Sequence, residues 1–291
     1  TGDGLIVSDG DIQVEAQQRF TNSGALAADG IEIHATNLEN QLDSVINAVW
    51  MSLDAQYATN FGTIQTGQLS LASGVLRNEA TATGDDSYTG GLLMITSEED
   101  NAFRLNGNGL ENTAGARLQL HSASNQIDGE VINQGVLAAL GDGELSFNGL
   151  VNHQGVVYSG GSITVDQADW DNRQGEMRAD GAVNAVVEIL NNTQGVVQAT
   201  AGLNISADSV ANVDGSVFSE NGIALSLQQA LDNTRGAVVA ESGEVTIQAD
   251  RLLNERGFIE QAGYGDLTLE LDSLLNNTGG QINTQSHLLI D

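Results

Sequence analysis

The chain repeats one short pattern of apolar and polar positions along nearly its whole length. At thirteen places an apolar residue is followed two positions later by asparagine, usually with glycine two or three residues further on. Successive asparagines lie 18 to 23 residues apart, except for one gap of 34. A fixed period of about 20 residues is the signature of a repeat architecture. The repeated asparagines are Asn22, Asn40, Asn60, Asn78, Asn112, Asn133, Asn152, Asn172, Asn192, Asn212, Asn233, Asn254 and Asn277.

Each repeat contains three short segments in which apolar residues alternate with polar ones. In one repeat these are Gly195-x-Val197, the pair Leu203/Ile205, and Val210-x-Asn212 at the corner. Alternation with a period of two predicts strands. Strands this short cannot pair within one repeat, so each must pair with its equivalent in the next. The pattern therefore predicts an all-β fold, a right-handed parallel β-helix of about 13–14 coils, as a single repeat domain over residues 1–291.

The asparagines and glycines are expected at corners for conformational reasons. Asparagine tolerates left-handed backbone angles, and its amide both donates and accepts, so identical side chains can hydrogen-bond from coil to coil. Glycine after the corner would supply a further special backbone angle. The chain contains no proline, which agrees with continuous ladders of strand hydrogen bonds. We expect one continuous asparagine ladder, broken only after Asn78.

Two segments depart from the repeat. Between Leu38 and Tyr57 the apolar spacing also fits one face of a helix, although the corner at Asn40 favours a coil without its glycine. The long gap predicts one coil with an insertion around residues 79–109. Within it, Leu92–Ile95 and the pair Phe103/Leu105 are expected to stay in the coil, and the polar stretches to loop out.

Charge limits the choice of partners. The net charge is −30, from 39 acidic residues against nine arginines and no lysine. Such a field repels phosphate backbones and anionic lipid headgroups, so we expect no nucleic-acid partner and no membrane insertion. The absence of cysteine does not distinguish an extracellular from a cytosolic location. No apolar stretch approaches the roughly 20 residues that span a bilayer, no signal peptide is recognisable at the start, and a mid-repeat beginning and end suggest a segment of a longer protein.

The repeat resembles a known family. The pattern L-x-N-x-x-G-x-V followed by G-x-L-x-I-x-A is similar to the haemagglutinin repeats of filamentous-haemagglutinin-like exoproteins, and Leu190–Gly195 and Leu231–Gly236 carry it most plainly. The resemblance covers nearly the whole chain. It identifies the architecture but does not separate host adhesins from biofilm adhesins or contact-dependent growth-inhibition effectors.

This resemblance implies a function. Proteins of this family are exported by two-partner secretion, so the implied partner during export is an outer-membrane transporter, and the implied location is extracellular or on the bacterial cell surface. The resemblance implies a structural shaft that mediates adhesion, including in virulence, or that presents a distal binding or toxin module for contact-dependent inhibition. A host or neighbouring-cell receptor or a glycan is a further implied partner.

Catalysis is the alternative, because β-helices also form polysaccharide lyases and hydrolases. Such enzymes need convergent carboxylates, and lyases need a basic residue as well. The insertion would have to provide this groove. Glu188 and Asp208 should stack on successive coils, where they could hold a cation or could simply face water. The prediction is that the protein is not an enzyme, with a carbohydrate-active β-helix enzyme as the alternative.

Other candidate residues are sparse. The acidic run Ser97–Asp100 and the pair Asp85–Asp86 could hold Ca²⁺ weakly, but neither has the spacing of a calcium loop. Trp170 falls at an inward corner position and is expected in the core. We therefore assign no catalytic, cofactor-binding or metal-binding residue and no cofactor. The histidines show no metal-ligand spacing; they are His34, His121, His153 and His287.

Overall fold

The structure is a parallel β-solenoid. The computed structural model describes residues 4–84, 87–106 and 108–291, and these residues form strands and turns without a helix. Strands pair in parallel with their equivalents one repeat later, giving about 14 turns with spacing near 20 residues. The all-β parallel β-helix is confirmed, and its right-handed sense stays a prediction. The chain forms two compact units, Thr1–Gly149 and Leu150–Asp291, which are described separately.

The first unit begins with long strands that bend around each coil. Thirteen or more residues of one coil pair with the next coil, as between β3 and β4, where Asn40 lies opposite Asn60. The segment with a possible helical face is strand throughout most of its length, so the strand interpretation is confirmed. These strands are β1 (Leu5–Val7), β2 (Asp11–Asn22), β3 (Ala25–Asn40), β4 (Val45–Asn60) and β5 (Thr63–Asn78).

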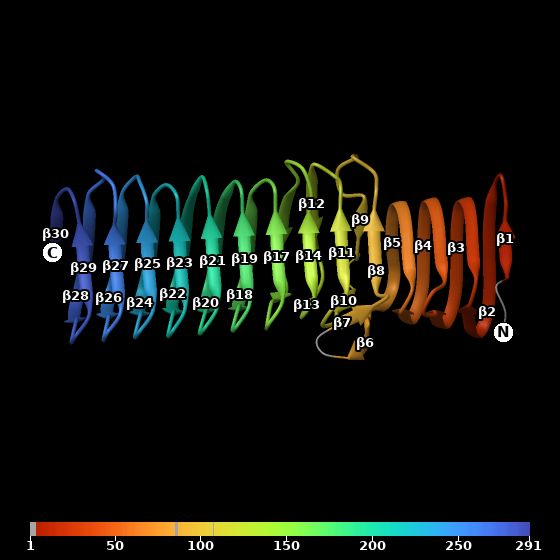
Figure 1. Ribbon diagram of the computed structural model, residues 1–291, viewed down its shortest axis with the longest axis horizontal. Coiled ribbons are helices and arrows are strands. Elements are labelled where there is room, and N and C mark those ends of the chain that lie inside the picture. Colours follow the sequence, from red (N-terminus) through yellow and green to blue (C-terminus); the bar gives the residue numbers. More distant parts are fainter. Residues whose placement is uncertain (1–3, 85–86, 107) are drawn as a thin grey trace. The chain divides into compact units, whose positions relative to one another are not determined.

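The insertion lies in the same unit. An antiparallel hairpin, β6 (Thr81–Gly84) with β7 (Ser87–Thr89), protrudes from the coil below β8 in Figure 1. After it, β8 (Leu92–Ile95) pairs with β5, and so does β9 (Phe103–Arg104). Leu105 is buried. The prediction that these apolar segments stay in the coil is confirmed.

Three separate strands per repeat occur only in the later coils of this unit. There, β11, β12 and β13 match the three predicted segments. The remaining strands of this unit are β10 (Gly109–Asn112), β11 (Arg117–Leu120), β12 (Ser124–Ile127), β13 (Val131–Asn133), β14 (Val136–Ala139) and β15 (Glu144–Phe147).

In the second unit the last two predicted segments join into one long strand. From Val156 to Asn276 each coil has a four-residue strand followed by a bent strand of nine or ten residues, and equivalent strands lie side by side in Figure 1. The strands are β16 (Leu150–Val151), β17 (Val156–Ser159), β18 (Ile163–Asp171), β19 (Glu176–Ala179), β20 (Ala182–Asn191), β21 (Val196–Ala199), β22 (Gly202–Ala211), β23 (Ser216–Ser219), β24 (Ile223–Asp232), β25 (Ala237–Ala240), β26 (Val245–Leu253), β27 (Phe258–Gln261), β28 (Leu267–Asn276), β29 (Gln281–Thr284) and β30 (Leu288–Ile290).

The core consists of stacked aliphatic columns. In one column of the second unit, the equivalent inward residue of each long strand is Val183, Leu203, Ile223, Val245 and Leu267. All five are buried. Burying a side chain of this kind stabilises a fold by about 1.5–3 kcal/mol. Stability therefore comes from many similar contacts between neighbouring coils, as in other repeat proteins.

Candidate functional site

The asparagine corners form a buried ladder of amides. In the first unit, each Nδ2 donates to Oδ1 of the next asparagine over 2.7–2.9 Å, from Asn22 to Asn133. The same ladder runs from Asn152 to Asn277 in the second unit, at 2.7–2.8 Å. Each Nδ2 also donates to a backbone carbonyl of the following coil, such as Ser216 for Asn192. These side chains are therefore structural.

The predicted break in the ladder is wrong. Asn78 Nδ2 donates to Asn112 Oδ1 over 2.9 Å, although 34 residues separate them. This is possible because β10 pairs directly with β5, with Asn112 opposite Asn78. The inserted residues lie between these two corners in sequence and leave their stacking intact.

The predicted backbone roles of asparagine and glycine at the second-unit corners are also wrong. At six of the seven corners the left-handed angle belongs to a non-glycine residue two positions after the asparagine, with φ between 53° and 63°. At the last corner Gly279 takes it, with φ of 66°, whereas the glycines three positions after the asparagines, such as Gly195, do not have positive φ. Instead, a Cβ on Gly195 would lie 2.1 Å from the carbonyl oxygen of Asn172, so glycine is needed for close approach of two coils. The left-handed residues are Gln154, Gln174, Gln194, Asp214, Arg235 and Arg256.

The outer surface is hollowed where the long strands bend. In the first unit, the register between β2 and β3 shifts between Ala16 and Arg19, which marks the bend. A shallow cavity of about 630 Å³ lies there on three successive coils. Its lining is mostly polar, so it suits a polar ligand or water better than an apolar one. The lining residues are Glu15, Ala16, Gln17, His34, Ala35, Thr36, Asp54 and Gln56.

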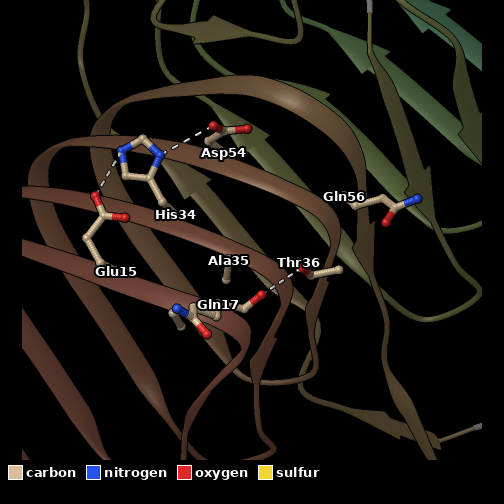
Figure 2. Close-up of a pocket in the computed structure, with 8 residues that line it drawn as sticks. Glu15, Gln17, His34, Ala35, Thr36, Asp54 and Gln56 are labelled. Atoms are coloured by element: carbon tan, nitrogen blue, oxygen red, sulfur yellow. Dashed lines mark hydrogen bonds and ion pairs between the residues drawn. The ribbon is translucent and has the colours of Figure 1, made fainter.

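His34 is the centre of the chemistry in this groove. Glu15, His34 and Asp54 lie opposite one another on β2, β3 and β4. His34 Nδ1 lies 3.3 Å from Asp54 Oδ2, and its Nε2 lies 3.0 Å from Glu32 Oε1 and 4.0 Å from Glu15 Oε1. Figure 2 shows the imidazole between Glu15 and Asp54. Both ring nitrogens therefore face carboxylates.

These contacts favour the imidazolium form. The hydrogen bond to Glu32, followed by that to Asp54, raises the pKa of His34 above its ordinary value of 6.5. Hydrogen bonds from Ser73 first and His34 second lower the pKa of Asp54 below 3.8. The pair is solvent-exposed, so water and salt screen it and its contribution to stability is small.

The order of the groups differs from that of a nucleophilic triad. Ser73 Oγ lies 2.5 Å from Asp54 Oδ1, so the hydroxyl contacts the carboxylate and not the imidazole. An activated serine must instead donate to the histidine that removes its proton. In this arrangement the carboxylates stabilise the charged imidazole of His34, and His34 does not activate Ser73. Among the described residues, no group of three or more His, Cys, Asp or Glu side chains could hold a metal ion.

The predicted carboxylate pair lies on the second unit at an equivalent bend. Glu188 and Asp208 fall between registered residues of β20 and β22, so they lie on neighbouring coils as predicted. Both line a cavity of about 420 Å³ together with Asp166. Their places on neighbouring coils agree with the prediction, and a bound cation there stays a prediction.

The insertion contributes a small cavity and no converging carboxylates. A hollow of about 220 Å³ is lined by Asn101, Arg104, Asn106, Gln126 and Asp128. It contains one arginine and one carboxylate, whereas acid/base cleavage of a glycosidic bond needs two carboxylates.

The acidic residues of the insertion do not converge either. Within the run Ser97–Asp100, the three carboxylates are exposed, and Glu99 accepts a hydrogen bond from Gln68 over 2.5 Å. The pair Asp85–Asp86 lies outside the described residues.

The remaining candidate residues are separated. Trp170 is 1% exposed, so its predicted place in the core is confirmed. His153 lies 4.0 Å from Asp171, and His287 lies 3.0 Å from Asp266 at another position on the second unit. His121 is exposed.

Sequence analysis missed the His34 groove. The signal was present, because Glu15, His34 and Asp54 are spaced by 19 and 20 residues, which equals the repeat. Residues spaced by one repeat must stack on neighbouring coils. Ionisable residues that recur at the repeat period, and not at the spacings of metal ligands, are therefore the signal that predicts this groove.

Two family models match the chain. Residues 263–290 match the haemagglutinin repeat, and residues 3–141 match the fourth domain of BigA. This chain is similar to the repeat region of filamentous haemagglutinins. No curated protein and no solved structure gives a significant match. The haemagglutinin-repeat match, together with the solenoid, favours an adhesin-like structural protein over an enzyme. In the described residues, no helix is long and apolar enough to cross a membrane.

Proposed function

We propose that the chain is a shaft segment of a secreted or surface-exposed bacterial filamentous-haemagglutinin-like exoprotein. It mediates adhesion or presents a distal binding or toxin module, as in contact-dependent inhibition. The whole chain acts as one repeat domain, with no catalytic, cofactor-binding or metal-binding residue. Export uses an outer-membrane two-partner-secretion transporter. The family resemblance supports export and location, and the haemagglutinin-repeat match supports the family resemblance.

The observation that carries the proposal is the buried amide ladder. The asparagines from Asn152 to Asn254 are almost wholly shielded from water, and each bonds to the next coil. A buried side-chain amide is costly unless its hydrogen bonds are made, so each corner requires a following corner of the same kind. This chemistry extends a solenoid from one coil to the next.

The surface supports the same function. The cavities are open hollows at the bends. In the His34 groove, Glu15 and Asp54 both contact the imidazole, and no arginine is among the described residues that line this groove or the cavity at Glu188 and Asp208. For the alternative, a carbohydrate-active enzyme, the insertion would have to supply the groove. Its hollow has a single carboxylate, Asp128, so this alternative is not favoured.

Binding and turnover assays on the same protein test the proposal. Beads coated with the purified chain are scored for attachment to bacterial and epithelial cells and to immobilised glycans. In parallel, the soluble chain is incubated with acidic and neutral polysaccharides, and new reducing ends and unsaturated products are measured. Attachment without product supports the adhesive shaft. Product that accumulates with time and enzyme concentration overturns it in favour of the enzyme.

A second experiment tests location. Antibodies against this segment are applied to intact cells that express the full-length protein, with and without the gene for the outer-membrane transporter. Surface labelling that requires the transporter is the expected result. Labelling only after cell lysis, in both strains, contradicts export.

A further inference from the structure

One bend of the second unit exposes two aliphatic side chains. Val186 is 62% exposed and Ile189 is 47% exposed, whereas Val187 and Leu190 between and beside them are buried. The alternation of β20 is interrupted here, so that Glu188 and Ile189 both face outward. Neighbouring exposed aliphatic residues are a common mark of a contact surface when they cluster.

Carboxylates surround this aliphatic pair. Asp166 and Asp169 lie one coil earlier, in direct register with its two members. Glu188 lies between the two aliphatic residues along the chain. Asp208 lies in the next coil, two residues after the partner of Val186, and lines the same cavity as Glu188. Neighbouring coils are about 4.8 Å apart. These six residues form a surface that we call the Val186–Ile189 face, and four of them line the cavity of about 420 Å³: Asp166, Val186, Glu188 and Asp208.

The charge of this face is not compensated by the protein. Some carboxylates elsewhere in the unit pair with arginine, as Asp214 does with Arg235 over 2.7 Å. None of the four carboxylates of the Val186–Ile189 face has an ion-pair partner within residues 150–291, all of which the structure describes. The chain contains no lysine that could reach them. Four carboxylates close together repel one another, and a cationic partner would relieve this repulsion.

We propose that the Val186–Ile189 face is a docking surface for a basic protein segment that carries aliphatic side chains between its arginines or lysines. The aliphatic side chains cover Val186 and Ile189, and the cationic groups meet the four carboxylates. A segment in extended conformation presents every second side chain to the face, about 6.8 Å apart, which spans between one and two coils. This surface lies on the shaft itself and is independent of any distal module.

Charge complementarity selects this partner over the other occupants. A second copy of the chain would bring its own net charge of −30 against an acidic face, so self-association is opposed by repulsion. Anionic lipid headgroups and nucleic acids are opposed for the same reason. A protein segment with both kinds of group can pair its cations with the carboxylates of this face and cover the exposed side chains of Val186 and Ile189.

The test uses the full 291-residue chain and two synthetic peptides. The probe peptide is Arg-Ser-Val-Ser-Arg-Ser-Val-Ser-Arg, which places arginine and valine on one side of an extended strand. The control peptide replaces both valines by serine and keeps the charge. Affinities are measured by calorimetry or fluorescence anisotropy at 50 mM and 150 mM NaCl. The probe peptide should bind at least tenfold more tightly than the control peptide.

Three variants separate this face from the general acidic field. Val186→Ser with Ile189→Ser removes the aliphatic pair and keeps the charge, and should weaken the probe peptide at least tenfold. Replacing the four carboxylates of the face by their amides should do the same for both peptides. A matched variant neutralises four exposed carboxylates away from the bend and should leave the affinities within twofold: Glu220, Glu241, Glu244 and Glu255 to Gln.

The outcomes decide the proposal. All substituted side chains are at least partly exposed, so the circular dichroism spectrum and melting temperature of each variant should match those of the parent chain. Equal binding of both peptides, equal loss in the two neutralised variants, or absence of probe binding at 50 mM NaCl each overturns the proposal. Sedimentation of the chain alone provides a further check. Concentration-dependent dimers that disappear in the Val186→Ser, Ile189→Ser variant would assign the face to a second copy instead.

Discussion

The buried amide ladder makes a quantitative prediction at Asn192. Its Oδ1 accepts from Asn172 Nδ2 over 2.7 Å. Its Nδ2 donates to Asn212 Oδ1 over 2.8 Å, to the carbonyl of Ser216 over 3.1 Å and, more weakly, to the carbonyl of Gly195 over 3.3 Å. Replacing Asn192 by alanine removes the three shorter bonds, each worth about 1 kcal/mol net, together with the long contact to Gly195. It also leaves Asn212 Oδ1 without its donor, which costs about 1–3 kcal/mol. We therefore expect a loss of about 4–6 kcal/mol.

An exposed asparagine pair provides the matched control. Asn204 Nδ2 donates to Asn184 Oδ1 over 3.0 Å on the surface of the same unit. Because water replaces an exposed hydrogen bond, Asn204→Ala should cost less than about 0.5 kcal/mol. The free energy of unfolding is measured by guanidinium titration at 25 °C. The fluorescence of Trp170, which is buried in this unit, reports the transition.

Asn192→Asp tests whether the donor or the shape matters. The carboxylate has nearly the shape of the amide but no N–H, so it faces two acceptors, Asn212 Oδ1 and the Ser216 carbonyl. Burial raises the pKa of the introduced acid above its unfolded value, so its destabilisation grows as pH rises through the unfolded value and declines again on acidification. The variant should lose at least as much stability as Asn192→Ala at pH 7, and part of it should return near pH 4. If Asn192→Ala and Asn204→Ala lose equal stability, the ladder does not hold the coils together and the reasoning is wrong.

Three further predictions follow from the coil geometry. Gly195→Ala places a methyl group 2.1 Å from a backbone oxygen and should cost about 2–3 kcal/mol in the same titration, whereas Gly109→Ala meets its nearest atom at 3.5 Å and should cost less than about 0.5 kcal/mol. Gln194 has φ of 57°, so Gln194→Gly should raise the free energy of unfolding by up to about 1 kcal/mol, and Gln194→Ala should not. The pKa of His34, followed by NMR titration, should lie above 6.5 and fall in Asp54→Asn. Protonated His34 therefore adds a small stability below pH 6.5 that disappears as pH rises through the folded-state pKa. If the pKa of His34 is the same in Asp54→Asn, the hydrogen bond to Asp54 does not raise it.

The fold was predictable because the repeat sets its own register. Once corners 20 residues apart are recognised, every residue has a neighbour one period away, and the places of Glu188 and Asp208 on neighbouring coils follow directly. The same period predicts that His34 lies between Glu15 and Asp54 on neighbouring coils. The buried position of Trp170 was predictable from its place before a corner asparagine.

The backbone of the corner was not predictable from residue type. Asparagine and glycine are the residues most tolerant of left-handed angles, yet at six of the seven corners of the second unit this conformation falls on glutamine, aspartate or arginine. The asparagine is required for its buried amide, and the glycine for the close approach of the preceding coil. Both tolerant residue types are therefore already needed at other positions of the corner. The residue between them adopts the left-handed angle, at a cost of about 1 kcal/mol. The expected break after Asn78 was wrong because an outward loop of any length leaves Asn78 opposite Asn112.

The coil separates the residues that build the solenoid from those that can contact a partner. Inside, identical amides and aliphatic columns must recur at every coil, since a single orphaned amide costs more than most surface contacts contribute. On the outer surface, each bend tolerates a different set of side chains. Examples are the carboxylates around His34 and the aliphatic pair Val186 and Ile189. Recognition can therefore vary from coil to coil without cost to the fold. Departures from the outward polar pattern are accordingly the positions at which a partner of such a solenoid should be sought.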